Sequence, residues 1–503
     1  MKTPLKTIIQ QLWTLLQNFG AWLLESTESM LDSALDNLVG KDHSLKAKFA
    51  SESSILSRRH NGFCLTGTKS ISPKLSRMGV LINGGSGSGK STIAGIPSCL
   101  QDNGSKIIHD PSGELYEKTS GFLESQGFTL IRIDWSDANH SHRFNPLNRA
   151  TTLSHYSKLA TQLVEASSEK KKDFWNASAI SLLVTVFRIV KLLPPEHQTL
   201  REAAHLIDLL QGTGHQEVDR LVATVCDRDP GLFDKYASLM GNSENTRSGI
   251  LASASTALKM YDLDEHIIRV TSTDNLGNFK QWRKEKTAVY IHSSTVNMDY
   301  YAPLSSIFLT QYFESFFESL PDTNDLDMGF ILDETPILSI DLPILAANVR
   351  KYAGSIVVFC QDSENQLTTS FGREGARSIL SNLKTKLYLT ASLDTAQALS
   401  KELGNYQYQD KETGHQKTRP LMTVDEIMTL PKGKGLITVT NEKPVLAKLT
   451  PYFRIPGLLK KTQLPPASPF PDIEDGEDRL PPLIDISDYL NSPTLNTTTH
   501  EQD

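Results

Sequence analysis

Residues 81–92 read LINGGSGSGKST, and this stretch decides the fold. It fits the spacing G-x-x-x-x-G-K-[ST] of a phosphate-binding loop, with Gly84 opening the pattern and Lys90-Ser91 closing it. The apolar residues 80–82 predict a buried strand before the loop, and residues 91–100 can form a helix after it. The sequence therefore predicts the strand, loop and helix context in which such a loop binds phosphate.

Each residue type in the loop suits one part of a nucleoside triphosphate. Glycines let successive backbone N–H groups turn toward phosphate oxygens, and the helix that follows adds partial positive charge. The Lys90 ammonium is a point charge for the β- and γ-phosphates, and the Ser91 hydroxyl suits Mg²⁺. We expect ATP and Mg²⁺ to contact Gly84, Gly85, Ser86, Gly87, Ser88, Gly89, Lys90, Ser91 and Thr92.

A second stretch supplies the acids that such a site needs. Residues 328–332 form an apolar strand that ends in Asp333 and Glu334. Asp333 can hold Mg²⁺ through water, and Glu334 can polarise the water that attacks the γ-phosphate. An apolar run that ends in two acids is a weak signal alone, but it becomes strong beside a phosphate-binding loop.

Two polar residues further along the chain are candidates for the same chemistry. The next predicted strand, residues 356–360, ends in Gln361, an amide placed to sense the γ-phosphate. Arg350 precedes that strand, where an oligomeric ATPase often has an arginine finger. The alternatives are a turn glutamine and an ordinary surface arginine.

Composition and charge narrow the class of protein. The chain has 503 residues, and its four cysteines form no C-x-x-C pair, so we expect a reducing compartment without disulfides or a zinc site. Net charge is −7, but residues 468–503 contain nine acids and one arginine, which leaves the remainder near +1. The acidic total therefore does not exclude a nucleic-acid partner.

The order of predicted elements gives an α/β fold with a mainly parallel sheet that is interrupted by an all-α insertion. We predict an amphipathic helical segment at 1–50, a nucleotide-binding motor domain at 51–151 and 270–455, and an all-α domain at 152–269. The proline-rich, acidic residues 456–503 predict a disordered tail.

The N-terminal stretch is apolar but falls short of a bilayer span. Residues 7–24 carry no charge, yet glutamines and an asparagine interrupt the run, and a 3–4 spacing of apolar residues continues to Leu38. An amphipathic helix fits this pattern. It can pack on a partner, lie at a membrane surface or cover the core, and the sequence does not choose among the three.

Together these residues resemble the type IV secretion coupling proteins, the hexameric RecA-like ATPases of conjugative DNA transfer. The resemblance covers residues 61–453. Besides the loop and the Asp-Glu strand, its motifs are residues 61–67, 96–97, 110–116, 144–147, 246–251, 287–290, 361–396 and 419–427.

The resemblance implies roles for the candidate residues. It implies a RecA-like fold in which Lys90, Ser91, Asp333 and Glu334 act as described above. It also implies that Arg350 is the arginine that acts on a neighbouring subunit and that Gln361 is the γ-phosphate sensor. The all-α domain would face DNA and the relaxase. Members usually begin with two membrane-spanning helices, and here only residues 7–38 stand in that place.

The resemblance further implies an ATP-hydrolysing, DNA-translocating coupling protein. Its expected partners are DNA bound without sequence preference, a relaxase or another secreted protein, the components of a type IV secretion channel and further copies of itself in a homo-hexamer. The alternatives are a receptor whose ATPase gates the handover of proteins, and an FtsK-like DNA motor. We expect a cytoplasmic location, with a peripheral position at the inner membrane through the N-terminal helix or a partner as the alternative.

Overall fold

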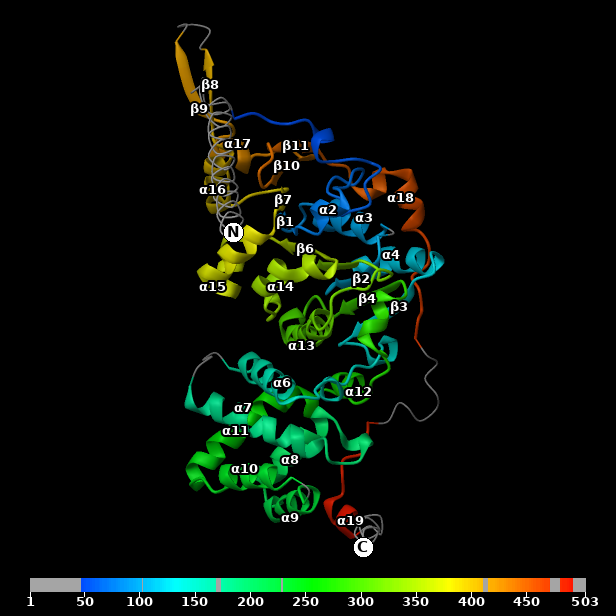
Figure 1. Cartoon of the computed structure of the whole chain (residues 1–503), viewed down its shortest axis with the longest axis vertical. Coiled ribbons are helices and arrows are strands. Elements are labelled where there is room, and N and C mark those ends of the chain that lie inside the picture. Colours follow the sequence, from blue (N-terminus) through cyan, green and yellow to red (C-terminus); the bar gives the residue numbers. More distant parts are fainter. Residues whose placement is uncertain are drawn as a thin grey trace, which may run out of the picture. The chain divides into compact units, whose positions relative to one another are not determined.

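The computed structural model describes residues 47–101, 103–168, 173–227, 229–409, 415–470 and 480–491. The strands of its main sheet are β1 (Val80–Asn83), β2 (Ser105–His109), β3 (Thr129–Asp134), β4 (Thr287–His292), β5 (Met328–Leu332), β6 (Gly354–Cys360), β7 (Thr385–Tyr388), β10 (Lys434–Val439) and β11 (Val445–Lys448). Within the described residues these nine strands follow the order β11-β10-β7-β1-β6-β5-β2-β4-β3 (Figure 1). Neighbours from β7 to β3 run parallel, whereas β10 is antiparallel to β7 and to β11. The expected α/β fold with a mainly parallel sheet is confirmed.

The central strands are buried on both faces of the sheet. Leu81 of β1 pairs with Val358 of β6, and both side chains enter one hydrophobic core. The next pair, Ile82 and Phe359, enters the core on the opposite face. Because both faces are covered, such strands read as continuous apolar runs, which is why the sequence revealed them clearly.

Helices cover each face of this sheet. Outside the all-α segment, the described helices before residue 455 are α2 (Pro73–Ser76), α3 (Ile96–Cys99), α4 (Glu114–Ser125), α5 (Pro146–Arg149), α13 (Met298–Phe317), α14 (Leu342–Asn348), α15 (Ser363–Asn382), α16 (Leu393–Leu403) and α17 (Val424–Met428). Leu115 and Leu123 of α4 enter the core that contains Ile82. Phe308 and Tyr312 of α13 enter the core that contains Leu81.

Between α5 and β4, the residues that the structure describes form α-helices and no β-strand. They are α6 (Leu153–Ala166), α7 (Phe174–Val190), α8 (Leu200–Gln211), α9 (His215–Val225), α10 (Pro230–Met240), α11 (Glu244–Leu263) and α12 (Glu265–Thr271). In Figure 1, α6 to α11 gather as a bundle, and α11 packs against α6, α7 and α8. Thr152, Asp173 and Thr199 cap α6, α7 and α8 by accepting a hydrogen bond from a first-turn N–H group. We call residues 152–269 the helical insertion.

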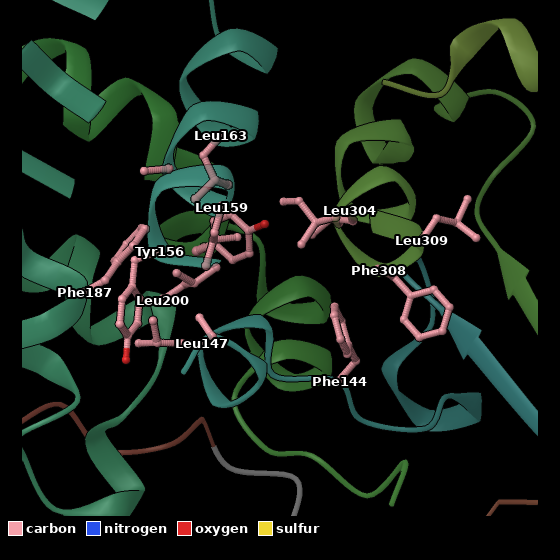
Figure 2. Close-up of a cluster of buried hydrophobic side chains, with 14 of the residues drawn as sticks. Phe144, Leu147, Tyr156, Leu159, Leu163, Phe187, Leu200, Leu304, Phe308 and Leu309 are labelled. Carbon is pink, nitrogen blue, oxygen red and sulfur yellow. The ribbon is translucent and has the colours of Figure 1, made fainter. Parts of the chain in front are cut away.

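The helical insertion shares a core with the sheet and its helices. Figure 2 shows Leu159 and Leu163 of α6 on one side and Leu304 and Phe308 of α13 on the other. Phe144, which precedes the insertion, packs edge-on against Phe308 with ring centroids 5.1 Å apart. One continuous hydrophobic cluster therefore runs from α13 into the insertion.

A smaller unit comprises residues 47–48 and 399–423, apart from 410–414. It contains the antiparallel strands β8 (Asn405–Gln409) and β9 (Gln416–Pro420). The N–H group of Ala47 donates to the carbonyl of Asn405 over 3.2 Å.

The tail differs from the expectation of disorder. Its described residues include α18 (Pro456–Lys461) and α19 (Ile486–Asn491), and Ala467, Ile484 and Ile486 are buried. The prolines of this segment prevent regular strands, but the aliphatic residues among them still pack, which the composition alone did not reveal.

The amphipathic segment predicted for residues 1–50 lies outside the described residues except for 47–50. Within the part of the chain that the structure describes, each helix is too short or too polar to cross a bilayer.

Candidate nucleotide-binding site

The glycine-rich loop leaves the carboxyl end of β1 and turns back before the next helix. Gly87 and Gly89 have φ angles of 71° and 95°, in the left-handed region that side-chain-bearing residues avoid. The Lys90 ammonium donates to the carbonyl of Gly84 over 2.7 Å, so it lies inside the loop. The Ser88 hydroxyl is buried and has no hydrogen-bond partner among the described residues.

The helix after the loop begins irregularly. Residues Ser91–Gly95 form a π-helical turn, closed by the N–H group of Ile96 donating to the carbonyl of Ser91, and α3 follows. Pro97 has no N–H to donate to the residue four before it, so an ordinary α-helix is interrupted at this point. The predicted helix over residues 91–100 is therefore present as two short pieces.

The two acids follow β5, two strands away from β1, with β6 between them. The N–H group of Asp333 donates to the carbonyl of His109 over 3.1 Å, which ties the end of β5 to the end of β2. Glu334 has a φ of 45°, an unusual value for a residue with a side chain, and such strain is often found at functional sites.

The buried carboxylates at the ends of β2 and β5 favour the binding of a cation. Burial, together with the neighbouring Glu334 and Asp110 carboxylates, raises the pKa of Asp333 to about 7 against the opposing effect of Lys90. Burial also raises the pKa of Asp110 to about 6. A site that disfavours its own negative charges gains stability when a metal ion or phosphate-bound cation compensates them.

Gln361 lies at the carboxyl end of β6, beside the acids. Its side-chain N–H donates to a Glu334 carboxylate oxygen over 3.2 Å. Its backbone N–H donates to the side chain of Gln366 over 2.8 Å, which fixes the turn into α15. The structure thus brings Gln361 and Glu334 into direct contact.

Sequence reasoning missed the polar residues that hold these loops together. Asn83 at the tip of β1 is fully buried; its side chain accepts from the N–H group of Ser363 over 2.7 Å and donates to the carbonyl of Thr390 over 2.9 Å. The Nδ1–H group of His109 donates to the carbonyl of Asp333 over 2.6 Å, and burial lowers the pKa of His109 to about 4. A polar residue at the end of an otherwise apolar strand was the available signal for both.

A cavity of about 940 Å³ contains the loop and the acids. Its walls include residues far along the chain that the sequence did not single out, from the segments 432–433 and 449–454. Among them, Phe453 is 49% exposed. The lining residues outside the loop are Pro111, Ser112, Glu114, Thr295, Met298, Asp333, Glu334, Thr390, Lys432, Gly433, Leu449, Pro451, Phe453 and Arg454.

Arg350 does not join this group in the same chain. It is exposed in a 3₁₀ turn, Val349–Tyr352, that precedes the amino end of β6, whereas Gln361 follows the carboxyl end. β6 has seven residues, so about 23 Å of strand separates the two ends. Any contribution of Arg350 to a nucleotide site must therefore be made to another copy of the chain.

Known proteins are similar to this chain in sequence and in fold. The sequence pattern of the family described as "Type IV secretory system Conjugative DNA transfer" matches residues 36–483. Protein VirD4 of Rhizobium rhizogenes is 22% identical over 404 residues, which cover 73% of this chain and 57% of the relative. The type IV secretion system-coupling protein VirD4 of Bartonella henselae is 23% identical over 354 residues, 67% of this chain and 54% of the relative. The chain thus spans little more than half the length of these curated relatives.

Solved structures show the same fold. The bacterial conjugative coupling protein TrwB, in its trigonal form with sulphate, superposes with a TM-score of 0.65 at 18% identity, covering 81% of this chain and 95% of that one. TrwB in complex with ADP and Mg²⁺ gives 0.64 at 17%, covering 82% and 96%. With the family pattern matched over most of its length, the chain belongs to the type IV secretory system conjugative DNA transfer family.

Proposed function

We propose that this protein is a Mg²⁺-dependent ATPase that recruits a relaxase–DNA complex to a type IV secretion channel and drives DNA translocation. One observation carries the proposal. In a chain of the conjugative DNA transfer family, Lys90, Asp333 and Glu334 line one cavity, and Gln361 touches Glu334.

The residues present fit ATP and Mg²⁺. The loop lines the cavity, its two left-handed glycines allow backbone N–H groups to turn toward phosphate oxygens, and the buried Ser88 hydroxyl lacks a partner among the described residues. TrwB, whose fold this chain shares, has been solved with ADP and Mg²⁺ and with a non-hydrolysable ATP analogue. Ser91 and Asp333 would hold the metal ion, and Mg²⁺ supplies positive charge that offsets the phosphate oxygens.

The chain's own residues would then have separate roles in the binding and hydrolysis of ATP. Lys90 and the loop N–H groups bind and orient the phosphates. Glu334 accepts a proton from the attacking water, and the Gln361 amide, already bonded to that carboxylate, orients it and senses the γ-phosphate. Phe453 and Arg454, on the wall formed by the C-terminal part of the chain, are placed to contact the base or ribose.

The position of Arg350 supports an assembly of several copies. Because Arg350 precedes the amino end of β6, whereas the cavity lies at the carboxyl ends of the strands, we assign it to the site of a neighbouring copy in a homo-hexamer. Arginine in this role stabilises charge in the transition state. We place the ring in the cytoplasm, with residues 7–38 or a partner protein holding it at the inner membrane.

The experiment that tests the ATPase compares two variants of the full chain. Lys90→Ala should lose nucleotide binding, because the charge inside the loop is gone. Glu334→Gln should bind ATP and hydrolyse it at least about 100-fold more slowly, because proton transfer to a positioned base contributes at least that factor. Lys259→Ala, at an exposed position of α11, is the matched control and should behave as wild type. Wild-type turnover in Glu334→Gln would refute the assignment of the base.

DNA tests the second half of the proposal. Single-stranded DNA should stimulate ATP turnover of the wild type, and rising salt should weaken the effect because phosphate contacts release counterions. Turnover that DNA leaves unchanged, but that a secreted protein substrate raises, would favour the receptor that gates protein handover.

A further inference from the structure

The last described segment of the chain, residues 480–491, packs on the helical insertion. Arg201 of α8 donates to the carbonyl of Pro481, and the N–H group of Ile484 donates to the Glu202 carboxylate over 3.2 Å. Ile484 and Ile486 are 5% and 4% exposed and belong to the same hydrophobic core as the insertion. Helix α19, which follows, packs against α9. The segment is held by both its backbone and its side chains.

The surface beneath this segment contains a buried carboxylate that accepts a hydrogen bond from the segment's backbone. The Glu202 side chain is 1% exposed and its carboxylate also contacts His197 Nδ1 at 3.1 Å. Its second oxygen has no hydrogen-bond partner among the described residues. A buried carboxylate in the first turn of a helix costs free energy unless donors satisfy it. The N–H group of the docked segment is one of the few donors that Glu202 has.

The preceding part of the tail is fixed to the motor domain. Tyr116 of α4 donates its hydroxyl to the carbonyl of Ala467 over 2.5 Å, and the N–H group of Ala467 donates to Ser120 over 3.1 Å. Phe470 lies under the guanidinium of Arg132 from β3, 5.9 Å from the ring centroid. The tail therefore contacts the motor before residue 471 and the helical insertion after residue 479.

We propose that Arg201, Glu202 and the adjoining faces of α8 and α9 form a peptide-binding site, and that the chain's own residues 481–486 occupy it as an intramolecular latch between the motor and the helical insertion. The ligand class is a segment with aliphatic side chains two residues apart, as in Ile484 and, at the start of α19, Ile486, and a main-chain N–H and carbonyl that are free to bond. This inference goes beyond the proposed ATPase and does not depend on it.

The binding half of the proposal is tested with a labelled peptide. Ile484→Asp in the full chain should release the segment, because a carboxylate cannot remain in the apolar site. A fluorescent peptide of residues 480–491 should then bind this variant. In wild type the peptide must compete with the tethered segment, whose effective concentration is roughly 1 mM. If the peptide binds the Ile484→Asp variant with a Kd of about 10 µM, it should bind wild type about 100-fold more weakly, which is the ratio of these two concentrations. Ser487→Ala, at an exposed position of α19, is the matched control and should bind the peptide as weakly as wild type does.

The outcomes separate the alternatives. Adding Arg201→Ala to the Ile484→Asp variant should weaken the binding of the peptide. A peptide that carries Asp in place of Ile484 should not bind to the Ile484→Asp variant. Equal affinity of the peptide for wild type and the Ile484→Asp variant, or no binding to that variant at 1 mM peptide, would overturn the site. The mass of the protein in solution is measured at rising protein concentration. If the mass rises for wild type but not for Ile484→Asp, a second copy supplies the segment, and the intramolecular latch is overturned. Neither nucleotide nor DNA enters these measurements.

The latch itself has a separate readout. Hydrogen exchange of the first turn of α8 and of α9 as a whole should become at least about tenfold faster in Ile484→Asp than in wild type or Ser487→Ala, because the covering segment has left. Unchanged exchange in both helices would refute the latch.

Discussion

Acidic pH should weaken the binding of Mg²⁺–nucleotide through Asp333. Burial raises the pKa of this carboxyl to about 7, with help from Glu334 and Asp110 and against the attraction of Lys90. The metal ion needs the ionised form, so a fall from about pH 8 to about pH 6 removes the ligand just where an aspartate normally stays charged.

The size of the effect follows from that pKa. About nine-tenths of the Asp333 carboxyls are ionised one unit above the pKa, and about one-tenth one unit below it. The affinity for Mg²⁺–ADP should therefore fall about tenfold between pH 8 and pH 6. An aspartate at its usual pKa of 3.8 would stay ionised throughout and would contribute no change.

Isothermal titration calorimetry of Mg²⁺–ADP at a series of pH values measures this directly. The nucleotide titrates over the same range, so Asp333→Asn is the control: it should bind more weakly at pH 8 and should show only the pH dependence of the nucleotide and the remaining groups. A pH dependence of equal steepness in wild type and Asp333→Asn would refute the argument that Asp333 titrates near neutrality.

Three further changes probe the ring, the core and the tail. Arg350→Ala should bind ATP but lose most of its ATP turnover. Mixing this variant with Lys90→Ala should restore part of the turnover, since each variant supplies what the other lacks. Mixed hexamers that are verified by mass and stay inactive would contradict a role of Arg350 in trans. Phe308→Ala, at a fully buried ring that meets Phe144, should lower the free energy of unfolding in urea by about 3–5 kcal/mol, whereas Phe308→Leu should cost less than about 1.5 kcal/mol; equal losses would argue against tight packing there. Gly121→Ala places a Cβ atom 1.9 Å from the carbonyl oxygen of Pro465, so residues 465–467 should leave α4 and become sensitive to protease, whereas Gly457→Ala has open space and should not change the cleavage; an identical pattern in both would contradict the packing.

The parts of the site that the sequence predicted are those encoded by a short local pattern. The glycine-rich loop, its apolar strand and the Asp333-Glu334 pair each lie within a few residues, so their geometry follows from nearby sequence. The position of Gln361 also followed, because consecutive buried strands of such a sheet tend to be neighbours. The parallel pairing of β5 with β6 then places Gln361 beside Glu334.

The parts that the sequence did not predict depend on contacts between distant segments. Nothing near Asn83 in the sequence indicates that its side chain joins Ser363 to Thr390, and nothing near Phe453 indicates that it lines the cavity. The packing of tail residues 465–470 and 480–491 was missed because it depends on contacts with α4, α8 and α9, which lie far away in the chain.

The hydrophobic cluster of Figure 2 also limits how this protein can evolve. Leu304 of α13 faces Leu159 of α6 in this cluster, so a replacement of the helical insertion by an unrelated one would leave apolar surface of α13 exposed. The insertion is therefore not a cassette that recombination could exchange at its two ends. New specificity in this bundle should arise by substitution on its outer helices, with α6 and α13 changing together.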